Sequence, residues 1–152
     1  MAHMVSDLMK AIRDALAADS DVTTMLTNGA DSIYYMLDPA DRDQLTVAKP
    51  FVHILPFTFP RIEGTTNSAH KHEVTLFVDF YFTEKKLVDK LEIFSDQAAK
   101  IEAVLKGTAL QTMAFSGNRA ELLEEGFEPE YIETDTEKLI RYTITYKYKQ
   151  TK

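Results

Sequence analysis

Residues 139–149 read Leu-Ile-Arg-Tyr-Thr-Ile-Thr-Tyr-Lys-Tyr-Lys, so that apolar and polar side chains alternate along the stretch. An alternation with a period of two predicts a β-strand with one buried face and one face in water. Residues 74–82 have the same period. Their core face is expected at Val74, Leu76, Val78, Phe80 and Phe82. These two stretches predict a sheet at the centre of the fold.

Two stretches have the period of a helix instead. The first begins near the start of the chain, where apolar residues form one stripe: Val5, Leu8, Met9, Ile12 and Leu16. A short second helix over 22–26 is expected to follow, capped by Asp19 or Ser20 and ended by Asn28-Gly29. The longer stripe runs from 87 to 105, at Leu87, Leu91, Phe94, Ala98, Ile101 and Leu105. This long helix is expected to lie across the sheet as its main packing partner.

Weaker patterns complete the list of elements. Strands are expected at 32–35, 51–55, 110–115 and 127–132, a helical turn at 119–125, and a long polar hairpin loop from Phe59 to Lys71. The 51–55 strand is apolar on both faces and should be covered on both sides, whereas Pro129 confines its strand to an edge. The order α-β-β-β-α-β-β-β predicts an α+β fold. It has a mainly antiparallel sheet packed by one long helix, with the N-terminal amphipathic helix added.

Composition indicates one soluble domain. The chain has 152 residues, 45% hydrophobic and 27% charged, and contains no cysteine. No apolar run approaches the roughly 18 residues that would cross a membrane. Residues 1–3 are expected to be a cloning scar, with the domain spanning 4–152. A net charge of −7 disfavours nucleic-acid binding as the main role.

The charge is distributed unevenly. Acidic residues crowd one region, at Glu121, Glu124, Glu125, Glu128, Glu130, Glu133, Asp135 and Glu137. Basic residues gather toward the end of the chain, at Arg141, Lys147, Lys149 and Lys152. The two ends of the domain are therefore expected to present opposite fields. The acidic stretch is interpreted first as a solvated face and second as an electrostatic docking surface.

Histidines offer the nearest approach to catalytic or metal chemistry. His70 and His72 lie two residues apart at a strand start, beside Glu73, but no third ligand is identifiable. His53 lies in an apolar strand without a nucleophile or carboxylate motif assigned to it. The five glycines form no phosphate-binding fingerprint. The sequence therefore predicts no enzyme, no metal site and no cofactor.

Asp79 is the unusual carboxylate, because it stands in mid-strand between Phe77 and Tyr81, where a charge is normally costly. Either that face is wet, or Asp79 pairs with a base on a neighbouring strand or on another subunit. Within the chain, Arg141 and Lys147 are the candidate partners.

The layout as a whole resembles a known family. It is carried by Leu8-Met9-Lys10-Ala11-Ile12-Arg13-Asp14-Ala15-Leu16-Ala17-Ala18-Asp19, Ile33-Tyr34, Lys49-Pro50-Phe51-Val52-His53-Ile54, the 74–82 strand, Ile101-Glu102-Ala103-Val104-Leu105 and Arg141-Tyr142-Thr143-Ile144-Thr145-Tyr146. Together these are similar to the tail terminator, or tail-completion, proteins of long-tailed bacteriophages and prophage-derived particles. The resemblance is one of element order and composition, from Met4 to Lys149, and includes no diagnostic motif.

The resemblance implies a structural protein of the virion tail and neck, assembled in the bacterial cytoplasm. Its partners would be copies of itself in a ring of six, the tail tube protein and the head-side connector. Such a ring would carry about −42, six times −7, so that DNA could pass through without specific binding. The docking residues we expect are Arg61, Glu63, Gly64, Thr65, Thr66, Asn67 and Lys71 of the hairpin loop, with Asp79 and Arg141.

Two alternatives stay open. Another phage neck, tail-tube or baseplate protein would share the same assembly logic. A small enzyme would require a pocket that gathers His53 or Asp79 with a second polar group.

Overall fold

The computed structural model describes residues 4–35, 50–57, 69–81, 91–115, 118–133 and 138–151. Helix α1 (Met4–Ala18) is followed by two short helical elements, α2 (Ser20–Met25) and η1 (Gly29–Ser32), and then by the edge strand β1 (Ile33–Tyr35). The rest are β2 (Phe51–Pro56), β3 (Ala69–Tyr81), α4 (Leu91–Leu105), α5 (Thr108–Gln111), β4 (Thr112–Phe115), β5 (Asn118–Glu133) and β6 (Lys138–Thr151). The predicted α+β class is confirmed.

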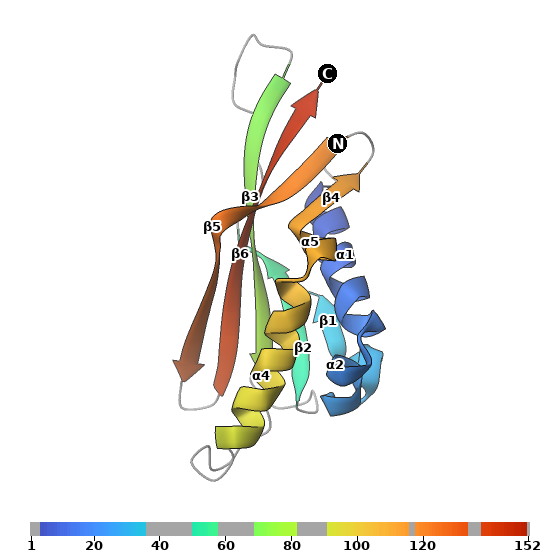
Figure 1. Ribbon diagram of the computed structural model, residues 1–152, viewed down its shortest axis with the longest axis vertical. Helices are drawn as coiled ribbons and strands as arrows, with labels where there is room; N and C mark the ends of the chain where they lie inside the picture. Colours follow the sequence, from blue (N-terminus) through green and yellow to red (C-terminus); the bar gives the residue numbers. More distant parts are fainter. Residues whose placement is uncertain are drawn as a thin grey trace.

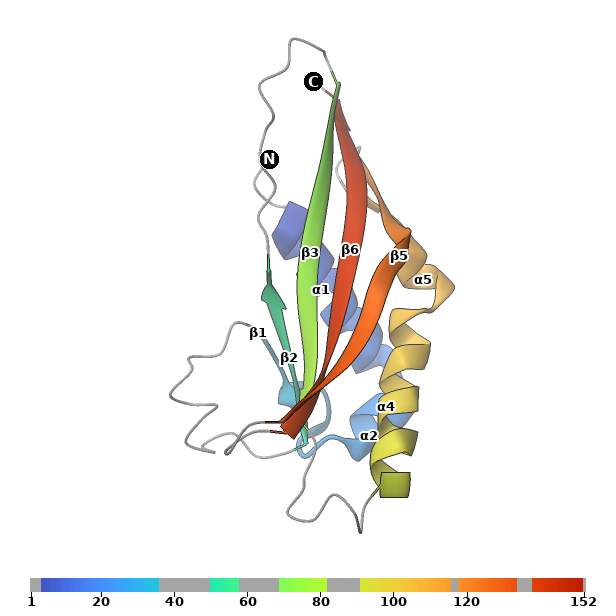
Figure 2. The same ribbon diagram turned by 90° about the vertical axis from the view of Figure 1, so that its left-hand side faces the viewer.

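The described strands form a six-stranded sheet in the order β1-β2-β3-β6-β5-β4. β1 pairs parallel to β2, and the other pairings are antiparallel, so the sheet is mainly antiparallel, as the order of elements predicts. The two clearest strands of the sequence, β3 and β6, are central neighbours over thirteen register pairs, from Ala69–Thr151 to Tyr81–Leu139. Figures 1 and 2 show α1, α4 and α5 on one face of this sheet, which we call the inner face.

The core lies between the helices and the inner face. Most of the expected inner positions of β3 and β6 are fully buried, including Val74, Leu76, Val78, Tyr142 and Ile144, whereas Ile140 is partly buried and Phe82 lies outside the described residues. Helix α1 supplies five buried side chains, at Val5, Leu8, Met9, Ile12 and Leu16, whereas the described side chains of α4 supply Ile101 and Leu105. The other predicted core residues of the long helix, Leu87, Leu91 and Phe94, have side chains outside the description, so its expected role as the main packing partner stays a prediction.

The outer face carries a second, smaller cluster. Phe51, Tyr81 and Leu139 are at most 2% exposed, and the rings of Phe51 and Tyr81 stack with their centroids 4.5 Å apart. Strand β2 is consequently buried on both sides, as its two apolar faces predict.

The turns at the N-terminal end form for local reasons. Asp19 caps α2 by accepting a hydrogen bond from the Val22 amide at 3.1 Å. Gly29 has φ of +59°, the left-handed conformation expected of it. Ser32, predicted to be in a strand, ends the 3₁₀ turn instead, where its hydroxyl accepts from the Asn28 amide at 2.8 Å. Arg13 donates to the carbonyls of Ala30 and Ile33 and so ties α1 to β1.

The largest error of the sequence predictions is the helical turn at 119–125, because these residues belong to strand β5. The strand pairs with β4 and β6 through Glu121 and then bulges: four residues, 123–126, lie opposite the single residue Thr145 of β6. The clustered leucines and glutamates of 121–125 imitate a helical face, but residues 121 and 122 pair with β6 and residues 123–125 belong to the bulge. Likewise, the predicted 110–115 strand is shortened by α5 to Thr112–Phe115.

The start of β3 and the position of Pro129 can also be compared with the sequence predictions. β3 begins at Ala69, so residues 69–71 are strand and not hairpin loop, while 58–68 lie outside the described residues. The expectation that Pro129 lies at an edge is confirmed, because residues 127–133 pair with β6 alone among the described strands.

Gly126 is the residue that lets the bulge close. A Cβ at this position would lie 2.6 Å from the Thr145 carbonyl oxygen and 2.9 Å from Cβ of Leu123. Gly126→Ala is therefore expected to lower the free energy of unfolding by about 1–3 kcal/mol. Urea denaturation measures the change, and Glu125→Ala in the same bulge, with an exposed side chain, should stay within about 0.5 kcal/mol. Equal midpoints for the two variants would contradict the close approach.

Candidate functional site

The expected docking residues fall into two groups. Residues 61–67 lie outside the described residues, and Lys71 is described as a position in β3. Asp79 and Arg141 are described fully and are register partners on the central strands β3 and β6.

Asp79 and Arg141 form a bidentate ion pair on the outer face. The Arg141 Nε and Nη2 atoms donate to Oδ1 and Oδ2 of Asp79, both at 2.9 Å. The Asp79 side chain is 0% exposed and that of Arg141 is 25% exposed. The guanidinium also lies over the Phe77 ring, 4.0 Å from its centroid. Of the two bases that the sequence offered to Asp79, the register selects Arg141, within the same chain.

The electrostatics agree with this geometry. Donation to the Asp79 carboxylate raises the pKa of Arg141 above its ordinary value, partly opposed by burial and helped by the charges of Asp79, Tyr81 and Glu130. A charge-assisted fork of this kind holds both side chains in one orientation.

His53 extends the pair into a row. The register places His53 of β2 opposite Asp79, and Glu130 of β5 opposite Arg141, so four ionisable residues cross four adjacent strands. His53 is 1% exposed. The structure thus brings together the two residues that an enzyme hypothesis names. Arg141 takes both carboxylate oxygens, however, and neither His53 nor Asp79 is open to solvent.

An exposed aromatic residue near this row is absent from the sequence predictions. Phe57 follows β2, donates its amide to the Thr75 carbonyl at 2.8 Å, and is 61% exposed. Its ring lies against Phe77, with centroids 4.8 Å apart. The sequence signal that could have identified Phe57 as exposed is its position immediately after Pro56, at a strand end where polar residues are usual.

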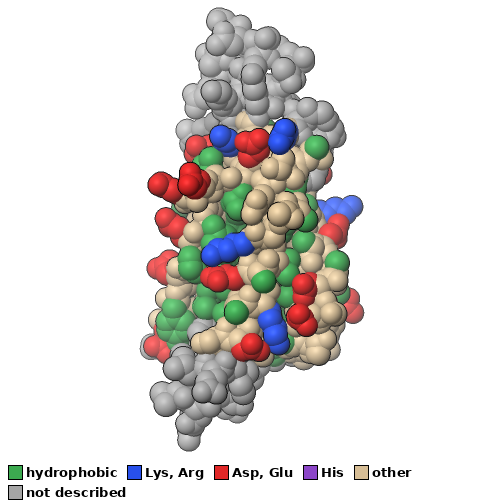
Figure 3. All heavy atoms as spheres, in the orientation of Figure 1, with side chains coloured by type: hydrophobic (Ala, Val, Ile, Leu, Met, Phe, Trp, Pro, Cys, Tyr) green, Lys and Arg blue, Asp and Glu red, His purple; other side chains and the backbone are tan. Residues whose placement is uncertain are grey.

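The described part of the acidic stretch, from Glu121 to Glu133, lies on β5 and is mostly exposed, whereas Asp135 and Glu137 lie outside the described residues. Glu124 and Glu125 lie in the bulge, and Glu128 lies just beyond it. Figure 3 shows acidic side chains spaced down the margin of the molecule where β5 runs. Glu121 contacts Nε of Arg119 at 3.4 Å and Nζ of Lys147 at 3.9 Å, and Glu133 accepts a hydrogen bond from the Tyr131 hydroxyl at 3.3 Å. Most of the stretch is therefore a solvated margin, with one local ion-pair cluster at its start.

No group of three or more possible metal ligands occurs among the described residues. His70 and His72 are strand positions whose side chains lie outside the description. No described helix is long and apolar enough to span a membrane.

Comparison with known proteins places the chain in no family. No family model matches the sequence, and no curated protein matches it. One solved structure, whose name states no function, is similar over 95% of this chain and 96% of its own length. Its sequence identity is 12% and the TM-score is 0.47. At this level the likeness carries no argument about function.

Proposed function

We propose that the chain is a structural assembly protein of the tail-terminator kind. It caps the head-proximal end of a phage tail tube as a ring, stops tube polymerisation and offers a surface to the head connector. The sequence resemblance from Met4 to Lys149 is the origin of this proposal.

The observation that carries the proposal is the order of elements over nearly the whole chain. The order predicted from the residue patterns, α-β-β-β-α-β-β-β, on which the resemblance was drawn, agrees with α1, β1 to β3, α4 and β4 to β6, apart from the short elements α2, η1 and α5. Agreement in the order of elements supports the proposed function, although a fold alone does not determine what a protein does. The surface adds support, because the exposed Phe57 and the exposed carboxylates of β5, at Glu124, Glu125 and Glu128, are features that subunit contacts use.

The His53 and Asp79 pair is the observation that favours a second candidate, a small enzyme. Its weakness is geometric, because the Arg141 fork occupies the carboxylate and the pair is buried in the sheet. A structural ion pair needs no further role. Another phage neck, tube or baseplate protein is the alternative that keeps the same assembly logic.

The test is removal of the gene from a phage or prophage that carries it, followed by electron microscopy of the particles. Overlong or headless tails, restored to normal by the intact gene in trans, are the expected result. Normal tails joined to heads would overturn the assignment. A complementing gene that lacks residues 65–69 tests the expected docking loop, once the purified variant is known to unfold cooperatively. Normal particles from that gene would remove the loop from the docking surface.

A further inference from the structure

The second half of strand β5 forms an open edge of the sheet. Residues 118–121 of β5 pair with β4 as well as with β6, whereas residues 127–133 pair with β6 alone among the described strands. Five of these seven residues are exposed, among them Tyr131 at 42%. We call residues 127–133 the β5 edge. An open edge presents unpaired backbone N–H and C=O groups, to which a strand of another chain can be added.

Pro129 removes a hydrogen-bond donor from the middle of the β5 edge. It is the register partner of Tyr142, and the pairing of β5 with β6 continues on both sides of it. A proline is compatible with such a ladder where its nitrogen, which carries no hydrogen, faces away from the neighbouring strand. Residues of an antiparallel strand direct their backbone groups to the two sides alternately, so Phe127 and Tyr131 face the open side together with Pro129. An added strand would therefore meet two donors with a gap between them.

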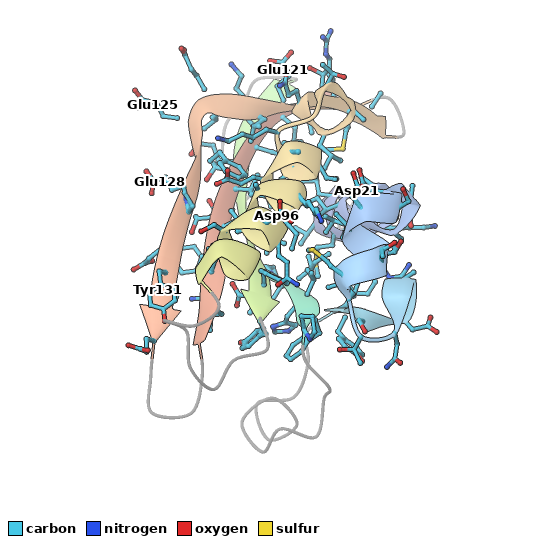
Figure 4. The ribbon with its side chains drawn as sticks, turned by 60° about the horizontal axis from the view of Figure 1, so that its bottom comes forward. Asp21, Asp96, Glu121, Glu125, Glu128 and Tyr131 are labelled. Carbon is cyan, nitrogen blue, oxygen red and sulfur yellow. The ribbon has the colours of Figure 1, made fainter. Side chains whose placement is uncertain are left out.

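Carboxylates flank the proline on both sides. Glu128 and Glu130 are exposed, and no described ion pair includes either of them. Figure 4 shows Glu128 pointing away from the sheet along the outside of β5. Two copies that paired their β5 edges antiparallel over 127–133 would place Glu130 directly opposite Glu130 of the second copy, and each Pro129 opposite Tyr131. Like charges directly opposite one another destabilise a strand pair, so this pair would combine repulsion with missing hydrogen bonds at its centre.

The bulge limits the β5 edge at its N-terminal end. Residues 123–126 lie opposite the single residue Thr145, and a bulge of this kind bends a strand and increases its twist. Figure 1 shows β5 turning sharply between the half beside β4 and the half beside β6. An added strand cannot follow β5 through this turn, so its pairing is confined to the β5 edge, where Pro129 and the two glutamates lie.

We propose that Pro129, Glu128 and Glu130 protect the β5 edge against pairing with strands of other copies of the chain. Proline and glutamate are both depleted in strands, so all three residues lower the strand propensity of the segment that contains them. Protection of an exposed edge accounts for this local disagreement between sequence and structure. The role goes beyond the proposed function and does not depend on it.

Three variants test the protection. The open-edge variant, Glu128→Thr/Pro129→Thr/Glu130→Thr, restores the missing donor and removes both charges, with a residue that suits exposed strand positions. Its net charge is −5, since two acids are lost from −7. The charge control, Asp14→Asn/Asp21→Asn, has the same −5 but changes exposed acids of α1 and α2. The glutamate variant, Glu128→Thr/Glu130→Thr, keeps the proline.

The measurement is sedimentation velocity of each folded protein over a range of concentrations, with amide hydrogen exchange of residues 127–133 followed on the same samples. The open-edge variant should self-associate at least about tenfold more tightly than the wild type and the charge control, because hydrogen bonds are gained and repulsion is lost. Exchange at residues 127–133 should slow as its concentration rises. The glutamate variant should lie between the open-edge variant and the charge control.

The comparison is specific to the β5 edge, because association through any other surface is common to all the variants. Association of the open-edge variant no tighter than that of the charge control would overturn the protection. Tighter association without slower exchange at residues 127–133 would overturn it as well, since the contact would then lie elsewhere. Should the open-edge variant fail to unfold cooperatively, the glutamate variant decides, and its equality with the charge control in both measurements would reject the proposal.

Discussion

Replacement of Arg141 by alanine is expected to lower the free energy of unfolding by about 3–5 kcal/mol, the usual effect of removing one member of a buried ion pair. The Asp79 carboxylate, at 0% exposure, would lose two charge-assisted hydrogen bonds of 2.9 Å and keep its desolvation. Truncation also uncovers the Phe77 ring, over which the guanidinium lies. Urea denaturation at neutral pH gives the change from the midpoint and slope.

Two variants separate the ion pair from general effects of truncation. Lys147→Ala removes a base from the same face of β6, where its side chain is 58% exposed, and should change stability by at most about 0.5 kcal/mol. Asp79→Leu/Arg141→Met replaces both charges by apolar groups and should be far milder than Arg141→Ala, since no buried charge is left behind. Equal losses in Arg141→Ala and the double variant would show that packing, and not charge, is what Arg141 supplies.

Alkaline solution is expected to destabilise the protein steeply above about pH 10, because two core phenols resist ionisation. Burial raises the pKa of Tyr142 and of Tyr146 well above the ordinary 10.0. Below pH 10 the folded and unfolded states both hold these protons, so the contribution is constant. Above pH 10 the unfolded state releases them first, and stability falls by about 1.4 kcal/mol per pH unit for each phenol.

Together the two phenols account for about 3 kcal/mol per pH unit, measured as urea midpoints between pH 8 and 11.5. Above pH 10, Tyr142→Phe and Tyr146→Phe should each reduce the fall in stability with pH by about 1.4 kcal/mol per pH unit, the contribution of one phenol. At neutral pH the two variants should differ, because Tyr142 donates to the Ala98 carbonyl at 3.2 Å, whereas the buried Tyr146 hydroxyl has no hydrogen-bond partner within the described part of the chain. Tyr142→Phe should lower the free energy of unfolding by about 1 kcal/mol, and Tyr146→Phe should leave it unchanged. An unchanged slope in the double phenylalanine variant would contradict the assignment.

Strongly periodic segments could be predicted from the sequence because their patterns report burial directly. The alternation in β3 and β6 identified the inner face, and the stripe of α1 identified its buried side chains. The caps at Asp19 and Gly29 were predictable because their chemistry is local. Residues 119–125 were mistaken for a helix, because a bulge inserts residues and destroys the period of two.

The candidate contacts were beyond sequence reasoning for a different reason. The choice between Arg141 and Lys147 as the partner of Asp79 depends on the β3–β6 register, which no local pattern specifies. The row of His53, Asp79, Arg141 and Glu130 depends on four strands at once, because these residues are far apart in the chain. The exposure of Phe57 depends on which residues cover the outer face beside it.

The central pairing of β3 with β6 also constrains how the chain matures during translation. Tyr81 ends β3 and Thr151 ends β6, so 70 further residues (151 − 81) must be synthesised before the pair can be completed. At roughly 5–20 residues per second this takes about 4–14 s. Through that interval the nascent β3 presents an apolar strand edge to the cytosol, where strand addition by other chains is favoured. Chaperone dependence and yield at high expression temperature should therefore follow the speed of the ribosome over the last 70 codons before Thr151.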